Sequence, residues 1–436
     1  MSFLPEPLRI PAFRAYWLSR LSTTIAQLAM VIVIGWQVYD IARDPNGLNM
    51  GLKQASLQLG LIGVVQFVPL LLLTLVTGWT ADRVDRRWIA RAAVGLELCC
   101  ALSLALLSWS GTTTLLALYT VAALLGVARA FAGPALGALA PNLVPRELLP
   151  KAIALSSISW QSGAIVGPAV GGYLYAVSPA APYIGSAILF AVALVGLMTI
   201  PPVARPALDR SVNPWKQMVE GLHYVRRNRL VLGAISLDLF AVLLGGATAM
   251  LPVFARDVLH AGPEGLGHLR AAPAIGATLT AIFFAFRPLK TNVGTKMLLA
   301  VAVFGVATVV FGLSRSMPVS LACLALLGAA DMFSVYVRQS LIQLYTPDEM
   351  RGRVGAVSSL FISASNELGE AESGFLGALI GPVTAVIAGG VGAIAVVGIW
   401  AWVFPELRLA RSFDPPDDKA ESSSRVHSLD TKESIP

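Results

Sequence analysis

The chain has 436 residues, of which 56% are hydrophobic and 13% are charged, and its mean hydropathy is +0.71. Soluble domains carry about 25% charged residues, so the composition excludes an ordinary soluble protein and indicates an integral membrane protein. The net charge of +7 would suggest nucleic acid as the partner of a soluble chain. In a membrane protein the placement of the charges matters more, and the expected partner is the lipid bilayer, with no nucleic acid.

Long apolar runs recur along the chain between polar breaks. A membrane-spanning helix needs about 20 mostly apolar residues. Runs of this length predict about twelve spans, at residues 13–38, 55–79, 89–110, 113–138, 153–176, 181–200, 230–254, 266–287, 295–314, 318–343, 354–378 and 381–404. Most Arg and Lys residues fall in alternate breaks, so the positive-inside rule predicts a multi-pass protein with both termini in the cytoplasm.

The longest interior break contains "NPWKQMVEGLHYVRRN", which predicts a short amphipathic helix at the cytoplasmic membrane surface, with Asn213 as its cap. Its expected apolar face consists of Trp215, Met218, Leu222 and Val225. This break separates two halves of about six spans each, an arrangement typical of transporters built from repeats. The expected parts are an N-terminal half at 1–200, a linker at 201–229, a C-terminal half at 230–405 and a disordered cytoplasmic tail at 406–436.

The second span is followed by "GWTADRVDRR", an aspartate-containing basic cluster. A positive-inside loop explains the arginines but not the aspartate four residues after a glycine. The string resembles motif A of the major facilitator superfamily, although Asp85 stands where many members have glycine. The matching gating residues are Gly78, Asp82, Arg83, Arg86 and Arg87. The resemblance implies that Asp82 latches the halves at the start of the span near Gly352, where a helix N-terminus attracts an anion.

The fifth span carries "GAIVGPAVGG". Glycines four residues apart let helices approach closely, and packing alone is one interpretation of the string. The string also resembles motif C of the superfamily, which marks antiporters and therefore exporters, although Ala154 replaces an upstream glycine of the full pattern. The matching residues are Gly163, Gly167, Pro168, Gly171 and Gly172.

In the fourth span, Arg129 is followed by Gly133. This spacing resembles motif B, whose arginine is linked to proton coupling in the superfamily, but Ala132 replaces the family's glutamine. A guanidinium within a membrane keeps its charge and needs an anion or a wet cavity. A purely structural ion pair that holds helices together is the alternative interpretation.

The resemblance extends along nearly the whole chain. Strings such as "PAFRAYWLSRL", "ARAFAGPALGALAPNLVPRE", "LPVFARDVL" and "TPDEMRGRVGAV" resemble the branch of bacterial inner-membrane exporters that includes the enterobactin exporter. The resemblance implies an all-α fold of about twelve helices in two six-helix pseudo-symmetric halves. It also implies a monomeric secondary transporter that works by alternating access and exports a small molecule, such as a siderophore or a drug-like compound, in exchange for protons.

Other function classes have less support in the sequence. An importer or a lysophospholipid flippase would share the fold, and a non-transporting membrane receptor or assembly protein remains an alternative. No Walker A string is present, the four histidines show no metal-ligand spacing, and no G-x-S-x-G occurs. We therefore expect no enzyme activity, catalytic residue, metal or cofactor, and we expect the proton gradient to be the energy source.

Proton-driven export requires a carboxylate whose protonation changes between states, because burial favours its neutral form and a nearby cation favours its charged form. The carboxylates within the predicted spans are Glu97, Asp238, Asp331, Glu367, Glu370 and Glu372. The cations within or near the spans are Arg20, Arg129, Arg270 and Arg338.

Five of these residues are the candidate proton or substrate coupling sites: Asp238, Asp331, Arg338, Glu367 and Glu370. Asp331 and Arg338 share a face of the tenth span, and Asp238 on the seventh span lies at a similar depth to Arg338. Glu367 and Glu370 are three residues apart and share a polar stripe, whereas Glu372 points away toward leucines. For both groups, structural ion pairs are the alternative to a role in coupling.

Overall fold

Helices form all the regular structure of residues 5–202, 214–287, 289 and 291–413, which the computed structural model describes. The N-terminal half contains α1 (Glu6–Arg9), α2 (Pro11–Arg43), α3 (Leu52–Arg83), α4 (Arg86–Trp109), α5 (Leu115–Leu139), α6 (Leu149–Val177) and α7 (Ala181–Met198). Two short 3₁₀ turns, η1 (Ala140–Asn142) and η2 (Arg146–Leu148), join α5 to α6. The predicted cap Asn213 and most of the predicted tail lie outside the described residues.

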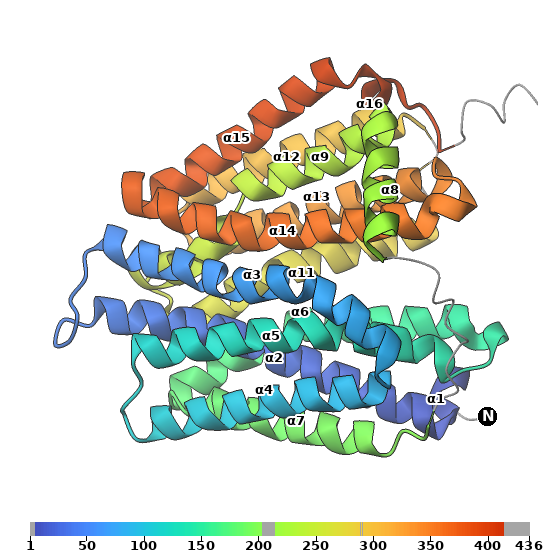
Figure 1. Ribbon diagram of the computed structural model, residues 1–436. Coiled ribbons are helices and arrows are strands. Elements are labelled where there is room, and N and C mark those ends of the chain that lie inside the picture. The colour runs from blue at the N-terminus through green and yellow to red at the C-terminus, as the bar shows by residue number, and fades with distance from the viewer. Residues whose placement is uncertain (1–4, 203–213, 288, 290, 414–436) are drawn as a thin grey trace, which may run out of the picture.

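The linker contains α8 (Pro214–Arg227), and the C-terminal half follows with α9 (Arg229–Leu244). A short irregular stretch follows, made of η3 (Ala247–Met250), α10 (Leu251–Val253) and η4 (Phe254–Val258). The remaining helices are α11 (Gly262–Phe286), α12 (Val293–Leu313), α13 (Met317–Leu344), α14 (Asp348–Ile380), α15 (Pro382–Val403) and α16 (Pro405–Leu409). Figure 1 shows the two halves as separate bundles lying against each other, the first coloured blue to green and the second yellow-green to red.

Ten stretches in the described part of the chain are long and apolar enough to cross a membrane. They correspond to ten of the twelve predicted spans. The other two, α6 and α14, are 29 and 33 residues long and run through the bundles beside the ten (Figure 1). Three of the glutamates of α14, Glu367, Glu370 and Glu372, lie within six residues of each other and lower the hydropathy of this helix.

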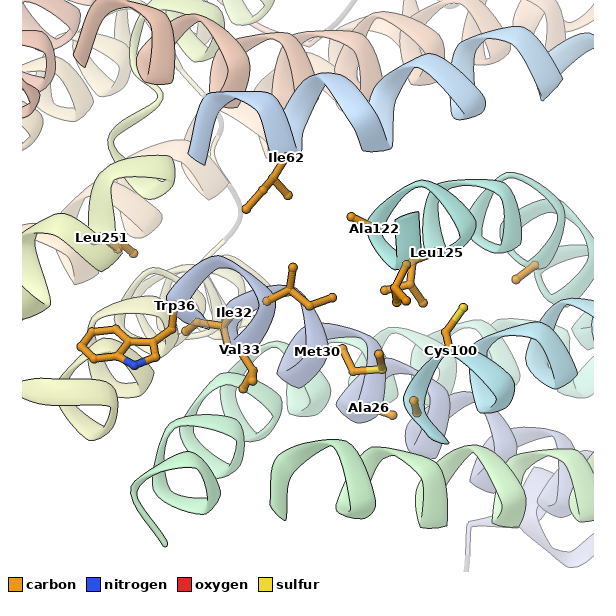
Figure 2. Packing of buried hydrophobic residues seen from close by; sticks show 14 of the residues in the cluster. Ala26, Met30, Ile32, Val33, Trp36, Ile62, Cys100, Ala122, Leu125 and Leu251 are labelled. Atoms are coloured by element: carbon orange, nitrogen blue, oxygen red, sulfur yellow. The ribbon is translucent and has the colours of Figure 1, made fainter. Parts of the chain in front are cut away.

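The core of the N-terminal half packs small and medium apolar side chains between helices. Met30 of α2, Cys100 of α4 and Leu125 of α5 are each at most 3% exposed, and Figure 2 shows them directed into the space between their helices. Ile62 of α3 joins the same cluster. This packing fixes α2, α3, α4 and α5 as one unit, which holds the polar residues described below in place.

The seventh predicted span, 230–254, differs from the structure. The α-helix α9 ends at Leu244, and the chain continues through 3₁₀ and π turns to Val258. The interruption falls at Gly245 and Gly246, where glycine is needed. A Cβ on Gly246 would lie 2.3 Å from Ser373 Oγ and 2.5 Å from the Gly369 carbonyl of α14.

The linker helix α8 forms where the sequence predicts it, and it contacts the rest of the protein through one member of the predicted apolar face. Val225 is buried in a cluster with Val354 and Val357 of α14. Leu222, expected on the same face, is 39% exposed. Gly221 packs against the Arg353 carbonyl, since a Cβ there would lie 2.8 Å from that oxygen. The helix therefore docks on α14 through Gly221 and Val225.

The two halves meet along two helix pairs, α3 with α14 and α6 with α11. At the first pair, a Cβ on Gly60 would lie 2.8 Å from Gly374 Cα. At the second, a Cβ on Gly172 would lie 2.4 Å from the Pro263 carbonyl oxygen. Small residues allow such backbone contact within a membrane. These contacts lie toward the end of the bundles that carries the α2–α3 connection, here called the α2–α3 end, and the bundles diverge toward the opposite end (Figure 1).

Candidate functional site

A cavity of about 440 Å³ lies between the two halves and is called the central cavity below. It has the size of many small-molecule sites. Side chains from both halves line it, and the polar and aromatic ones are Gln27, Gln66, Arg129, Trp160, Thr248, Arg270, Phe304, Asp331, Asn366, Glu367 and Glu370. The cavity lies at the interface of the two halves, the place where transporters built from repeats bind their substrates.

A larger cavity, of about 1370 Å³, lies beside α8, α9, the start of α14 and α16. Its lining residues come from the linker helix and the C-terminal half and none from the N-terminal half, so the relative movement of the halves would not expose it alternately to the two sides. Among the described residues, no group of three or more His, Cys, Asp or Glu is placed to hold a metal ion. The central cavity is therefore the candidate site.

One ion pair crosses the central cavity from half to half. Arg129 Nη2 of α5 lies 3.0 Å from Glu367 Oε1 of α14. Arg129 Nη1 donates a hydrogen bond of 3.1 Å to Gln66 Oε1 of α3. The Arg129 side chain is 37% exposed and the Glu367 side chain 10% exposed. The guanidinium predicted to lie within a span thus has a carboxylate partner, and that partner belongs to the opposite half.

A second ion pair lies on the cavity wall within the C-terminal half. Arg270 Nη2 of α11 lies 3.1 Å from Glu370 Oε1 of α14. Arg270 Nη1 also donates to the Thr248 carbonyl, at 3.1 Å. Glu367 and Glu370 therefore face the same cavity, as their spacing predicts, and each is paired with a different arginine.

Behind this wall, Asp238 of α9 and Arg338 of α13 form a buried ion pair. The structure brings these two residues together as the sequence predicts, but neither lines the central cavity. Asp331 does line it. Ser334 Oγ and Arg338 Nε, which lie on the same helix as Asp331, are buried without a hydrogen-bond partner. A polar strip thus runs from the cavity at Asp331 to the buried pair.

Two further carboxylates within the spans do not line the cavity. Glu97 of α4 is fully buried and accepts a hydrogen bond of 2.5 Å from Gln27 Nε2. Its other oxygen, Oε2, is buried without a partner. Glu372 is half-buried and lies outside the residues that line the cavity, which agrees with its predicted direction away from Glu370.

The motif C glycines act as packing positions. Added Cβ atoms would lie 2.5 Å from Thr24 at Gly163, 2.7 Å from the Ile25 carbonyl at Gly167 and 3.2 Å from Ala29 at Gly171. These three glycines face α2 of the same half. Gly172 faces α11 of the other half, and Pro168 lies buried among them. The structure thus gives each motif C glycine a close helix contact.

The motif B glycine behaves differently, since a side chain at Gly133 would meet open space. The α5 glycine in close contact is Gly126, where a Cβ would lie 2.6 Å from the Gln66 carbonyl. The sequence reasoning missed Gly126, because a single glycine in an apolar run carries no distinctive pattern.

The motif A residues lie at the turn between α3 and α4. Gly78, Asp82 and Arg83 are in the last turns of α3, and their side chains are outside the described part of the structure. Arg86 begins α4, and Arg87 pairs with Asp85 at 2.6 Å. Asp85 also caps α4 by accepting a hydrogen bond of 3.0 Å from the Arg87 backbone N–H. The departure from glycine at position 85 therefore supplies a helix cap.

The start of α14, predicted as the docking point of Asp82, contacts the linker helix. Arg353 Nη1 lies 2.7 Å from Glu220 Oε2 of α8. A side chain at Gly352 would meet open space. The latch through Asp82 stays a prediction, since the side chain it depends on is not among those described.

A cluster of charges at the α2–α3 end joins the halves, and the sequence reasoning missed it. Arg256 Nη1 of η4 lies 2.5 Å from Asp40 Oδ1, and Arg43 Nη2 lies 3.2 Å from Asp257 Oδ1. Tyr39 OH donates to Asp257 Oδ2 at 2.5 Å. We call Tyr39, Asp40, Arg43, Arg256 and Asp257 the outer network. A signal was present, because "YDIAR" and "ARD" place an acid and a base close together in two separate breaks.

Comparison with known proteins gives concordant matches. A family model described as transmembrane secretion effector matches residues 4–423. The enterobactin exporter EntS of Shigella boydii is 27% identical over 417 residues, which cover 95% of this chain and 96% of that protein. EntS of Escherichia coli O1:K1 matches with the same identity and coverage.

Solved structures share the fold at low sequence identity. A bacterial homologue of the human lysosomal transporter Spinster, in an inward-facing and occupied conformation, has a TM-score of 0.71 at 14% identity, covering 93% of this chain and 99% of that one. A bacterial homologue of the iron transporter ferroportin, in an inward-facing state, has a TM-score of 0.66 at 15% identity, covering 93% and 100%. At this identity the likeness supports the fold.

Proposed function

Because this chain belongs to the transmembrane secretion effector family of the major facilitator superfamily, we propose that it is a secondary transporter that exports a small molecule in exchange for protons. The observation that carries the proposal is the Arg129–Glu367 ion pair, which joins the two halves across the central cavity. Charged residues within a membrane are costly and mark substrate or proton pathways. A pair shared between halves changes its surroundings whenever the halves move.

The proposed topology has twelve spans and both termini in the cytoplasm. Ten helices qualify by length and composition, and α6 and α14 complete the set. The helices α1, α8 and α16 lie at the same end of the molecule (Figure 1), and the breaks at that end are rich in Arg and Lys. In a bacterial inner membrane, the α2–α3 end would then face the periplasm.

The places where the halves touch support alternating access. The Gly60–Gly374 and Gly172–Pro263 contacts and the outer network all lie toward the α2–α3 end. This arrangement supports a state closed to the periplasm, with the central cavity reached from the cytoplasm. Export would require these contacts to break while new ones form at the opposite end, where motif A lies.

The cavity chemistry supports an anionic substrate with aromatic groups. Arg129 and Arg270 supply guanidinium groups, and Trp160 and Phe304 supply aromatic faces. An acidic substrate group would compete with Glu367 and Glu370 for these arginines. The similarity to EntS makes a siderophore the proposed class, with the proton gradient as the energy source and a monomer as the working unit.

Inside-out inner-membrane vesicles, prepared from cells that lack their own enterobactin exporter, test the direction of transport. We expect enterobactin to accumulate in these vesicles when the chain is present and a proton gradient is imposed, and an uncoupler to abolish the accumulation. Accumulation in right-side-out vesicles instead would show an importer. Absence of transport in both, with correctly inserted protein, would refute the siderophore class.

Neutral variants of the two cavity glutamates test the coupling. We expect Glu367→Gln and Glu370→Gln each to abolish gradient-driven efflux while insertion stays normal, because each removes the negative charge that faces an arginine at the cavity. Glu372→Gln is the matched control on the same helix, since Glu372 lies outside the cavity lining. Wild-type efflux rates in a correctly inserted Glu367→Gln or Glu370→Gln variant would rule out a coupling role for that residue.

A further inference from the structure

A groove of about 1040 Å³ runs between α11, α12 and α13 and is called the lateral groove below. Its rim is apolar and exposed, since Leu279 and Leu299 are each 63% exposed and Phe283 is 54% exposed. Small side chains, among them the buried Ala300 and Ala330, leave the space between the helices unfilled. Because these three helices span the membrane, the exposed apolar rim faces lipid tails.

The lateral groove is separate from the central cavity. Gly276 packs against the Ala325 carbonyl and Gly328 against the Pro273 carbonyl, with no room for a Cβ at either glycine. The helices α11 and α13 are thus in backbone contact along the boundary between the two spaces. Pro273 and Gly328 line the central cavity, whereas Gly276 and Ala325 line the lateral groove, and the two spaces share no described lining residue. The groove is therefore not an extension of the candidate substrate site.

The charged residues that line the lateral groove are all basic among those described. They are Arg287, which follows the last residue of α11, and Lys296, in the first turn of α12. Neither has an ion-pair partner among the described residues, and Lys296 Nζ donates a hydrogen bond of 3.5 Å to the Thr291 hydroxyl. The acids on these three helices are Glu264, in the first turn of α11, and Asp331, which lines the central cavity. The groove therefore combines an apolar length with two cations at one end.

The length of the lateral groove matches one leaflet of a bilayer. Gly276 and Arg287 both line it and are eleven residues apart, which is about 16 Å along a helix. The hydrocarbon core is about 30 Å thick, so one leaflet contributes about 15 Å. The helix α11 begins at the α2–α3 end, where Pro263 contacts Gly172. Arg287 therefore lies at the opposite end, which faces the cytoplasm in the proposed topology.

The cavity beside α8 lacks this arrangement of charge. Arg229 and Arg353 line it together with Glu406 and Glu220, and the four side chains form two ion pairs. An anionic ligand that approached these arginines would have to compete with the protein's own carboxylates. In the lateral groove no described carboxylate competes for Arg287 and Lys296.

We propose that the lateral groove binds one anionic phospholipid of the cytoplasmic leaflet, with the lipid phosphate held by Arg287 and Lys296 and an acyl chain lying along Leu279, Phe283 and Leu299. Arg recognises phosphate through its fork of N–H donors. Basic pockets between membrane-spanning helices on the cytoplasmic side are typical sites for anionic headgroups. A zwitterionic headgroup would bring its own cation toward the two basic residues, so a net negative lipid is favoured. Only the choice of leaflet rests on the proposed topology.

Native mass spectrometry of the delipidated full-length protein in detergent, titrated with phosphatidylglycerol, measures this binding. We expect one phosphatidylglycerol molecule to bind more tightly than any further one. Arg287→Gln/Lys296→Gln should lower this affinity roughly 30-fold, the factor that corresponds to two cations at about 1 kcal/mol each. The affinity for phosphatidylcholine should change much less. Arg226→Gln/Arg408→Gln is the matched control, because it removes two exposed cations of α8 and α16 that lie outside the groove lining, and it should keep the wild-type affinity.

A second variant tests the acyl chain separately from the headgroup. Ala329→Leu keeps both cations and fills part of the groove that Ala329 lines, so we expect it to lower the affinity for both lipids.

Three results would overturn the proposal. Wild-type affinity for phosphatidylglycerol in Arg287→Gln/Lys296→Gln, or an equal loss in the control pair, would refute the headgroup site. Unchanged affinity in Ala329→Leu would refute the groove as the place of the acyl chain. A dimer that forms without bound lipid and dissociates in Ala329→Leu would assign the groove to a second copy of this chain. These measurements do not involve enterobactin, so a failure of the transport assay leaves their result standing.

Discussion

Asp238 and Arg338 form the most deeply buried ion pair that involves described residues. The Arg338 side chain is 2% exposed and the Asp238 side chain 6% exposed. A buried pair contributes little net stability, because desolvation offsets its attraction. Removing one partner is costly, because a charge is left unpaired, and a guanidinium cannot lose its proton to escape that cost.

Thermal unfolding of the purified protein should show this asymmetry. Asp238→Asn is expected to destabilise the protein by roughly 3–5 kcal/mol, because Arg338 keeps its charge with no paired carboxylate. Arg338→Gln should cost less, because Asp238 can take up a proton. The double variant Asp238→Asn/Arg338→Gln should recover much of the loss. If the unfolding temperature of the double variant fell by as much as the two single decreases added together, the loss of stability would not come from the ion pair.

Charged residues with a functional or structural role can be recognised in the sequence when they interrupt apolar spans, because placing a charge within a membrane costs free energy. For this reason the sequence alone singles out Asp238, Glu367 and Glu370 as candidates. It does not identify the partner of Arg129. Pairing across the halves depends on how α5 and α14 face each other, and no periodicity within one span encodes that relation.

At the scale of helices, glycines determine how closely the two halves approach. Gly172 of α6 faces the Pro263 carbonyl and Gly267 of α11. A larger side chain there would push α6 and α11 apart at the α2–α3 end. Gly133 of α5 offers a comparison, because a side chain there meets open space.

Gly172→Val should therefore favour a state open at the α2–α3 end. The test uses Thr248→Cys in the cavity lining as a reporter, in a background that lacks the native cysteines. With the proposed topology, labelling by a membrane-impermeant thiol reagent from the periplasmic side should increase in Gly172→Val and stay at the reference level in Gly133→Val. Equal labelling of both variants would show that the α6–α11 contact does not close this end.

The sequence predicted most helices because apolar runs of membrane length have few other structures available. The sequence did not predict features that depend on contacts between distant segments. The seventh span is interrupted at Gly246, where α14 approaches closely, and the linker helix docks on α14 through Val225. Both contacts join segments far apart in the chain, so neither leaves a local pattern.

At the scale of the whole molecule, the outer network joins the halves by two reciprocal ion pairs. Asp40 and Arg43 of α2 face Arg256 and Asp257 of η4, so each side offers one acid and one base. All four side chains are between 24% and 45% exposed. Single pairs at such exposure contribute about 0.2–1 kcal/mol. Two pairs that break together would still bias the balance between the states closed and open at this end.

Charge reversal tests whether the network is a latch. Arg256→Asp replaces attraction to Asp40 by repulsion, and a change of about 1–2 kcal/mol would shift the balance between states roughly 5–30-fold toward the open one. The Thr248→Cys reporter should then label faster from the periplasmic side. Asp40→Arg alone should act likewise, because Arg256 then faces a like charge. The double variant Asp40→Arg/Arg256→Asp restores the pair with its charges exchanged and should return labelling toward the reference rate. If each substitution only damaged the structure locally, the effects of the two on labelling would add in the double variant. Rescue of the labelling rate is therefore explained only by a paired contact between the halves. Labelling that stays fast in the double variant would show that the network does not hold this end closed.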